Sequence, residues 1–334
     1  MTKLTIIYGN GFDINLGLNT KFTDFYKWLE SEKKHEDDKI YQFIKNEKNI
    51  DYLNWSDLEV GLGEYTLKNK FDVEEFMNSH DNLLEDLNEY LLLEQAHLNI
   101  SPFMVDNILI STLNQIPLTL SATSQKKEAK LIEAAYSWGL SINFISFNYT
   151  ENMEKLIQEP RNLQGFKSNC KLNMPIHIHG ILRESKVLGV NDSSQYAHHL
   201  FDEDFAKYFV KNNLLKSISS SQLDDSLEVI NNSDIILLFG VSLGSTDKFY
   251  WEKILNWLKE DTSRILLYHD YETTLPINGW SSQRLIDRYL SKSKLKFIES
   301  VMLDNEATYK IAQQILPLYG SQFFPNLSDE KMFE

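Results

Sequence analysis

Short apolar runs, each closed by a glycine or a polar residue, recur along the chain and predict buried strands. The first is LTIIY at Leu4–Tyr8, which ends at Gly9. Later runs of the same kind predict strands at Ile142–Phe147, Pro175–His179, Ile235–Phe239, Ile265–His269 and Leu295–Ile298. Because these runs are continuously apolar rather than alternating, they are typical of strands covered on both faces of a parallel sheet.

Helical periodicity occupies most of the chain between these runs. Apolar residues recur at intervals of three and four from Thr20, which is placed to cap the first helix, to about Trp138. The polar segment Arg161–Met174 is expected to be a surface loop. Further helices are expected at Glu151–Gln158, Glu203–Lys211, Asp225–Asn231, Asp247–Leu258, Ser282–Leu290 and Glu306–Leu316.

Strands that alternate with helices in this way indicate an α/β fold with a mostly parallel sheet. The helical block after the first strand interrupts that alternation. We therefore expect one discontinuous α/β domain, residues 1–19 and 139–320, and a large helical insertion or lid, residues 20–138.

Charge balance and cysteine content exclude several classes of function. The 334 residues include 33 Lys and Arg against 48 Asp and Glu, a net charge of −15. This balance argues against nucleic acid as a partner, since phosphate neutralisation requires basic surface. The single cysteine, Cys170, excludes an intrachain disulfide and a zinc site built from several thiolates. The most apolar later run, Ile235–Leu243, is far shorter than the ~20 residues of a membrane-spanning helix. We therefore expect a cytoplasmic protein with no membrane partner.

Glycine and polar residues follow four of the predicted strands. Because the carboxyl ends of parallel strands share one edge of a sheet, where ligands bind at a topological switch point, these residues predict a single site. The four clusters are Gly9-Asn10-Gly11-Phe12-Asp13, Asn148-Tyr149-Thr150, His179-Gly180, and Gly240-Val241-Ser242-Leu243-Gly244 with Thr246 and Asp247.

The first cluster is typical of a phosphate-binding turn. Gly9 and Gly11 allow the backbone to turn tightly and approach a phosphate, with amides free to donate. The third glycine of the dinucleotide fingerprint is missing, because Ile14 takes its place. Asp13 is placed either to bond a ribose hydroxyl or to cap the next turn.

Asn148 and His179 are the candidates for chemistry. The Asn148 amide can fix a sugar hydroxyl or a water, or it can simply end the strand through its own side-chain turn. His179, at a strand end, suits acid–base work near neutral pH. His177 points to the same face and is more typical of a hydrogen-bonded core histidine. We expect no metal, since no further ligand lies nearby in the sequence.

Two motifs keep alternatives open. The sequence Gly240-Val241-Ser242-Leu243-Gly244 matches the nucleophile elbow of serine hydrolases, although His269 is the only histidine that follows it. The alternative is that Ser242 and nearby amides bind a phosphate. In the motif WSDLE, Trp55 lies on an apolar helix face beside Glu59, which is either a solvated acid or reaches the site.

The motifs GNGFD, WSDLE, FNYTEN, IHIHG and GVSLGSTDKFYW, in this order, resemble the AbiH-type bacteriophage abortive-infection family. That family in turn resembles a distant sirtuin-like branch, which implies a Rossmann-like sheet and NAD as substrate. Thr150 stands where sirtuins carry Asp, and the zinc-binding cysteines are missing, so peptide deacylation is disfavoured.

The resemblance implies hydrolysis of NAD to nicotinamide and ADP-ribose after a phage-derived trigger, with the insertion as a gate or a homo-oligomer contact. It makes Asn148 and His179 the catalytic pair, and Asp13 or Glu59 a source of negative charge. The alternatives are a nucleotide sensor without turnover and the serine hydrolase. The expected cofactor-binding residues are Gly9, Asn10, Gly11, Phe12, Asp13, Gly180, Gly240, Ser242, Leu243, Thr246 and Asp247.

Overall fold

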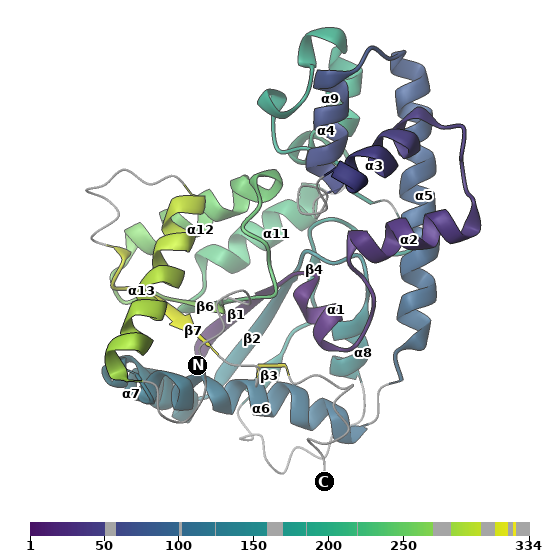
Figure 1. The fold of residues 1–334 in the computed structure, drawn as a ribbon. Helices are drawn as coiled ribbons and strands as arrows, with labels where there is room; N and C mark the ends of the chain where they lie inside the picture. Colours follow the sequence, from purple (N-terminus) through teal and green to yellow (C-terminus); the bar gives the residue numbers. More distant parts are fainter. Residues whose placement is uncertain are drawn as a thin grey trace.

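The computed structural model is built around a parallel sheet of seven strands (Figure 1). It describes residues 1–50, 58–99, 102–123, 125–158, 170–184, 186–218, 220–269, 282–301, 311–319 and 323–324. The strand order is β3-β2-β1-β5-β6-β7, with β4 also paired to β2. The strands are β1 Thr2–Tyr8, β2 Leu140–Ser146, β3 Cys170–Leu172, β4 Ile176–His177, β5 Ile235–Phe239, β6 Ile265–His269 and β7 Ile315–Leu318.

Alternate side chains of each strand point to opposite faces, and helices cover both. On one face, Ile6 of β1 and Leu237 of β5 pack against three helices: α6 Pro102–Ser121, α7 Lys126–Ser137 and α8 Asn152–Gln158. On the other face, Ile7 and Leu238 pack against α11 Ser220–Asn231, α12 Lys248–Glu260 and α13 Gln283–Ser300. The result is the expected α/β fold, a three-layer sheet buried on both sides.

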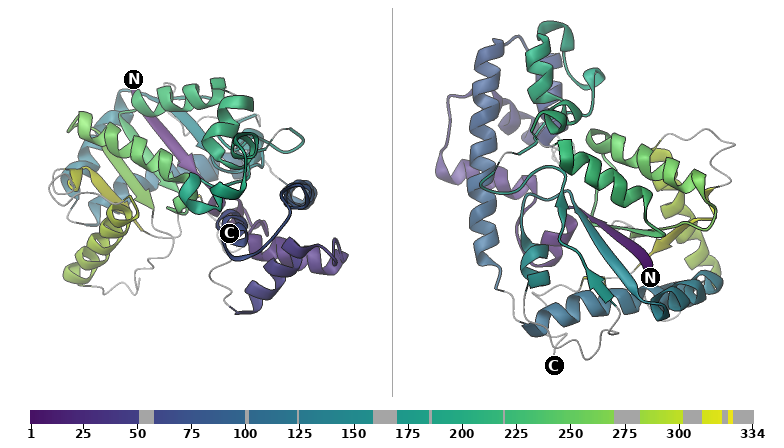
Figure 2. Two further views of the ribbon diagram at one scale, coloured as in Figure 1. Left: turned by 90° about the horizontal axis from the view of Figure 1, so that it is seen from above. Right: turned by 180° about the vertical axis from the view of Figure 1, so that it is seen from behind.

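A separate group of helices, which we call the helical lobe, stands to one side of the sheet (Figures 1 and 2). Its own apolar core is built on residues such as Phe25, Leu62, Phe76 and Phe209. The lobe consists of α2 Phe22–Glu32, α3 Lys39–Ile50, α4 Leu58–Lys68, α5 Val73–His97 and α9 Glu203–Phe209.

The packing divides the predicted insertion. Helices α2 to α5 belong to the helical lobe, whereas α6 and α7 place Ile116 and Ile132 against the sheet. The lobe also takes residues from far along the chain, among them Tyr196 and Phe209. Within the described part of the chain, no helix combines the length and the apolar character needed to cross a bilayer.

Three expectations about the secondary structure were wrong. The run Leu295–Ile298 lies inside α13, and the last strand is instead β7 at Ile315–Leu318. The expected helix Glu306–Leu316 therefore fails at its end, while residues 306–310 lie outside the described residues. In the expected loop Arg161–Met174, residues 170–172 form the edge strand β3; residues 161–169 are not described.

Candidate functional site

A cavity of about 530 Å³ opens at the carboxyl ends of β1, β2 and β5. The chain leaves β1 toward β2 on one side and returns to β5 on the other, so this is the topological switch point of the sheet. Helices α4 and α5 of the helical lobe close the opposite side. The lining brings together eleven of the predicted site residues: Gly9, Asn10, Gly11, Asp13, Glu59, Asn148, His179, Gly240, Ser242, Thr246 and Asp247.

The glycines at the carboxyl ends of β1 and β5 allow the loops after these two strands to contact each other closely. A Cβ at Gly11 would lie 2.4 Å from the Cα of Gly240, and Gly240 itself has a φ of +61°. The Gly9 amide donates to the Phe239 carbonyl, and the Gly11 amide donates to the Gly240 carbonyl. The expectation that these two amides are free to bind phosphate is therefore wrong, because carbonyls at the end of β5 and at the start of the loop after it accept them.

Asn10 ties the first loop to the start of the helical lobe. Its Nδ2 donates to the Thr20 carbonyl at 2.7 Å, and its Oδ1 accepts the Thr20 hydroxyl. Thr20 does not cap the first lobe helix as expected: α2 begins at Phe22 after Lys21, and no side chain caps it. The hydroxyl is used by Asn10 instead.

Asp13, in the short helix α1 (Gly11–Asn15), is fully buried and holds the loop that follows β2. One carboxylate oxygen accepts the Thr150 hydroxyl at 2.5 Å, and the other accepts Asn152 Nδ2 at 2.9 Å. Burial, opposed by these two hydrogen bonds, raises the pKa of Asp13 to about 6. Asp13 therefore stabilises the loop at the site, because both of its carboxylate oxygens already have protein partners.

This buried carboxyl predicts a pH-dependent stability difference. Because the pKa of Asp13 in the folded state lies above the unfolded value of 3.8, the folded state binds the proton more tightly than the unfolded state. The stabilisation that this proton provides is lost as pH rises from about 4 to 6. The loss is about 3 kcal/mol at 1.36 kcal/mol per pKa unit. Asp13→Asn removes it, so the unfolding free energy of the variant relative to wild type should rise by this amount between pH 4 and 7 in urea titrations. A pH-independent difference would contradict the assignment.

Asn148 presents an unused donor to the cavity. Its side chain is buried, and Nδ2 has no hydrogen-bond partner within the described residues. The backbone behind it is fixed, since the Asn148 carbonyl lies 2.8 Å from His177 Nδ1. His177 Nε2 in turn lies 2.5 Å from Glu154. Burial alone would lower the pKa of His177, but the hydrogen bond with Glu154 raises it. His177 is thus the hydrogen-bonded core histidine that its position suggested.

His179 belongs to a buried charged chain that continues through Asp247 and Lys211 to Glu59. Its Nε2 lies 3.0 Å from Asp247 Oδ1, and the same oxygen accepts Lys211 Nζ at 2.9 Å. The Lys211 ammonium also contacts Glu59 Oε2 at 2.6 Å. Glu59 therefore reaches the site and is not a solvated acid. Lys211 was not among the predicted site residues, because in the sequence it resembles any lysine at the end of a helix. Only its two carboxylate partners distinguish it.

Burial and the charge of Lys211 lower the pKa of His179, against the effects of Asp247 and the Phe147 carbonyl, which favour the protonated ring. Burial alone would raise the pKa of Asp247, but Lys211 holds it well below its usual range. For Lys211, the two carboxylates overcome burial and raise its pKa. His179 is therefore neutral near pH 7, and Asp247 is ionised. A neutral imidazole held by a carboxylate can accept a proton.

The other predicted residues that the structure describes are not part of the cavity lining. Phe12 is in the apolar core, against the ring of Phe324. Leu243 packs against the core on the other face of the sheet. Gly180, with a φ of +81°, forms a backbone bridge with Lys186, and the cavity lining does not include it. Trp55 and the Asp57 beside it lie outside the described residues.

The serine-hydrolase alternative lacks the required geometry. A nucleophile elbow places its serine on a strained turn directly between strand and helix. Ser242 has no positive φ, and residues 240–244 separate β5 from the 3₁₀ turn η5, Ser245–Asp247. Among the described residues, no hydrogen bond joins Ser242 to a histidine, and His269 packs between the rings of Phe239 and Phe323.

Residues 5–269 match the family described as bacteriophage abortive infection AbiH. The chain belongs to the AbiH family. The match runs from within β1 to the end of β6, so every cavity-lining residue of this AbiH protein lies inside it. Among curated proteins, no match was found.

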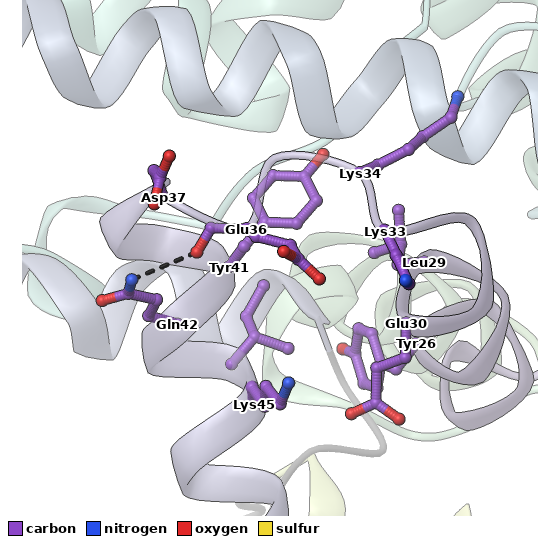
Figure 3. A pocket seen from close by; sticks show the side chains of 11 residues that line it. Tyr26, Leu29, Glu30, Lys33, Lys34, Glu36, Asp37, Tyr41, Gln42 and Lys45 are labelled. Atoms are coloured by element: carbon purple, nitrogen blue, oxygen red, sulfur yellow. Dashed lines mark hydrogen bonds between the residues drawn. The ribbon is translucent and has the colours of Figure 1, made fainter.

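A second cavity of about 430 Å³ lies within the helical lobe between α2 and α3 (Figure 3). Three of its polar side chains, Lys34, Tyr41 and Gln42, are engaged with the protein. Lys34 reaches α5, where it pairs with Asp86, and Gln42 donates to the Glu36 carbonyl. Tyr41 also donates to Asp86. We take the cavity at the sheet edge as the candidate site, because eleven of the predicted residues meet there.

Proposed function

We propose that this AbiH protein binds NAD at the carboxyl edge of its sheet and hydrolyses it to nicotinamide and ADP-ribose in phage defence. Membership of the AbiH family supports a role in abortive infection. The observation that carries the chemistry is one cavity that holds both the unpaired Asn148 amide and the oriented, neutral His179. A volume of about 530 Å³ falls in the range of small-molecule sites, ~300–1,000 Å³.

The pyrophosphate is assigned to the loop after β5. The amides of Gly9 and Gly11 are already used, so the loop from Val241 to Gly244 is the better anion site. This loop leads through η5 into α12, a helix of 13 residues whose positive N-terminal end favours phosphate. The exposed Ser242 hydroxyl adds a donor. The nicotinamide ribose then lies toward Asn148 and His179.

The reaction breaks the bond between the ribose C1′ and the pyridinium nitrogen. Its electron pair moves to the ring nitrogen and releases neutral nicotinamide, while the ribose develops oxocarbenium character. The Asn148 amide orients the ribose or the attacking water. The water oxygen bonds to C1′, and its proton passes to the His179 imidazole. The carboxylates of Asp247 and Glu59 both contact the single ammonium of Lys211, so one negative charge remains unbalanced. This charge would stabilise the developing cation.

Such an activity in a resting cell would poison its host, so we propose that a phage-derived trigger releases it. The test is to incubate the purified chain with NAD, with and without phage lysate, and to follow nicotinamide and ADP-ribose by chromatography. Ser242→Ala should raise KM and leave kcat nearly unchanged, since Ser242 is assigned to binding. Binding of NAD without product under every trigger would contradict the proposal, as would Ser242-dependent cleavage of esters.

A further inference from the structure

Lys211 lies at the point where the helical lobe meets the sheet edge. It is the first residue of α10, Lys211–Ile218, and only 4% of its side chain is exposed. Its ammonium lies 2.6 Å from Glu59 Oε2 of α4 and 2.9 Å from Asp247 Oδ1 of η5. A lysine is seldom so deeply buried unless it is paired, and here it is paired on both sides.

The Asp247 oxygen that binds Lys211 is also the one that binds His179. His179 Nε2 lies 3.0 Å from Oδ1, and Lys211 Nζ lies 2.9 Å from it. The two donors therefore share one acceptor. Lys211 neutralises part of the negative charge of Asp247, so it determines how strongly this carboxylate binds the imidazole. Glu59 in turn neutralises part of the positive charge of Lys211.

Glu59 is on the helical lobe, whereas Asp247 is at the sheet edge. It lies at the start of α4, where its other oxygen is 3.4 Å from the Gly189 amide. Leu58 and Leu62 of the same helix are in the core of the helical lobe. Phe209 and Val210, which directly precede Lys211, are in the same core, and the Lys211 amide donates to the Val190 carbonyl. A displacement of the helical lobe relative to the sheet would therefore carry Glu59 and Lys211 together and separate Lys211 from Asp247.

We propose that Lys211 is a positioning residue for the His179–Asp247 pair, and that its contact with Asp247 makes the charge state of this pair depend on the position of the helical lobe. Glu59 sets how much of the lysine charge the pair experiences. The inference rests on the proposed function only in naming His179 as the base. It gives the helical lobe a way to regulate the site, because lobe movement changes the charge that His179 faces.

Lys211 and Glu59 are expected to shift the pKa of His179 in opposite directions. Among the described residues, the charged groups that face His179 are Asp247 and Lys211, with Glu59 behind Lys211. Removing the lysine frees Asp247 to stabilise the imidazolium, so the pKa of His179 rises. Removing the negative charge of Glu59 leaves Lys211 less balanced, so that pKa falls. A residue that only filled space would not produce opposite shifts.

The experiment is an NMR titration of the full chain with ¹³C-labelled histidine, in which His179→Gln assigns the resonance. Lys211→Met should raise the pKa of His179 by about one unit or more, and Glu59→Gln should lower it. Glu64→Gln is the matched control on α4: this carboxylate is exposed and pairs with Lys68, so the variant should leave the titration unchanged. The resonance of His177, whose partner is Glu154, should not move in any variant.

Lys211→Met leaves two buried carboxylates without their cation and so threatens the fold. The double variant Lys211→Met/Glu59→Gln removes one charge of each sign, should melt at a higher temperature than the single variant, and should still show the raised pKa of His179. An unchanged pKa in both Glu59→Gln and the double variant would overturn the proposal, and so would shifts of the same sign in the two single variants. Because the titration needs no NAD, these outcomes are independent of whether the chain hydrolyses NAD.

Discussion

Replacing His179 with alanine is expected to lower kcat for NAD hydrolysis by about 10²–10⁴-fold, the usual contribution of a positioned general base. The imidazole lies in the cavity at the sheet edge, and Asp247 fixes its orientation. Because burial and Lys211 lower the pKa of His179, wild-type activity should persist below the usual histidine midpoint of about 6.5 and decline only as pH falls through the lowered value. The measurement is nicotinamide release across a pH series for both proteins.

The companion variant Asn148→Ala separates chemistry from folding. Asn148 Nδ2 makes no hydrogen bond within the described residues, so the substitution removes no such bond of this amide group. Its activity should fall as in the His179 variant, while its urea midpoint stays close to that of wild type. A variant that loses stability and activity together, or that keeps its activity, would contradict the assigned role of Asn148.

The sequence was sufficient to predict which residues lie together where one rule of topology applied. Gly9, Asn148, His179 and Gly240 each follow a buried run, and parallel strands bring their carboxyl ends to one edge. Lys211 could not be predicted in this way, because it follows no strand. Its role comes from Glu59 and Asp247, which only the packing of the helical lobe against the sheet brings to it.

The fold was predictable in its centre and less so at its edges. Strands β1, β2, β5 and β6 are flanked on both sides and covered on both faces, which favours apolar residues over most of their length. The edge strand β3 has one neighbour and only three residues, and it follows a polar stretch of sequence, so its pattern resembles a loop. Strand β7 contains Pro317, which is tolerated at an edge but weakens the strand pattern. The short apolar run at Leu295–Ile298 instead supplies one face of α13.

Replacing Gly240 with alanine is expected to lower the free energy of unfolding by about 3 kcal/mol or more and to disrupt the cavity. The backbone at Gly240 has a φ of +61°, which L side chains rarely adopt, and its Cβ would lie 2.7 Å from backbone atoms of Gly11 and Phe12. Backbone strain and forced separation each cost about 1–3 kcal/mol. The two loops would have to separate, and the hydrogen bond from Gly11 to Gly240 would be lost. Urea unfolding measures the first effect, and NAD binding by calorimetry measures the second.

Gly244→Ala is the matched control, because Gly244 lies in the same loop with a φ of −67° that any residue adopts. Its unfolding free energy should stay within about 0.5 kcal/mol of wild type. If Gly240→Ala proved equally mild, the close approach of the loops after β1 and β5 would not be needed to shape the cavity. If only Gly240→Ala lost both stability and NAD binding, the glycines of these two motifs would serve the contact between loops, and the nucleotide would depend on that contact indirectly.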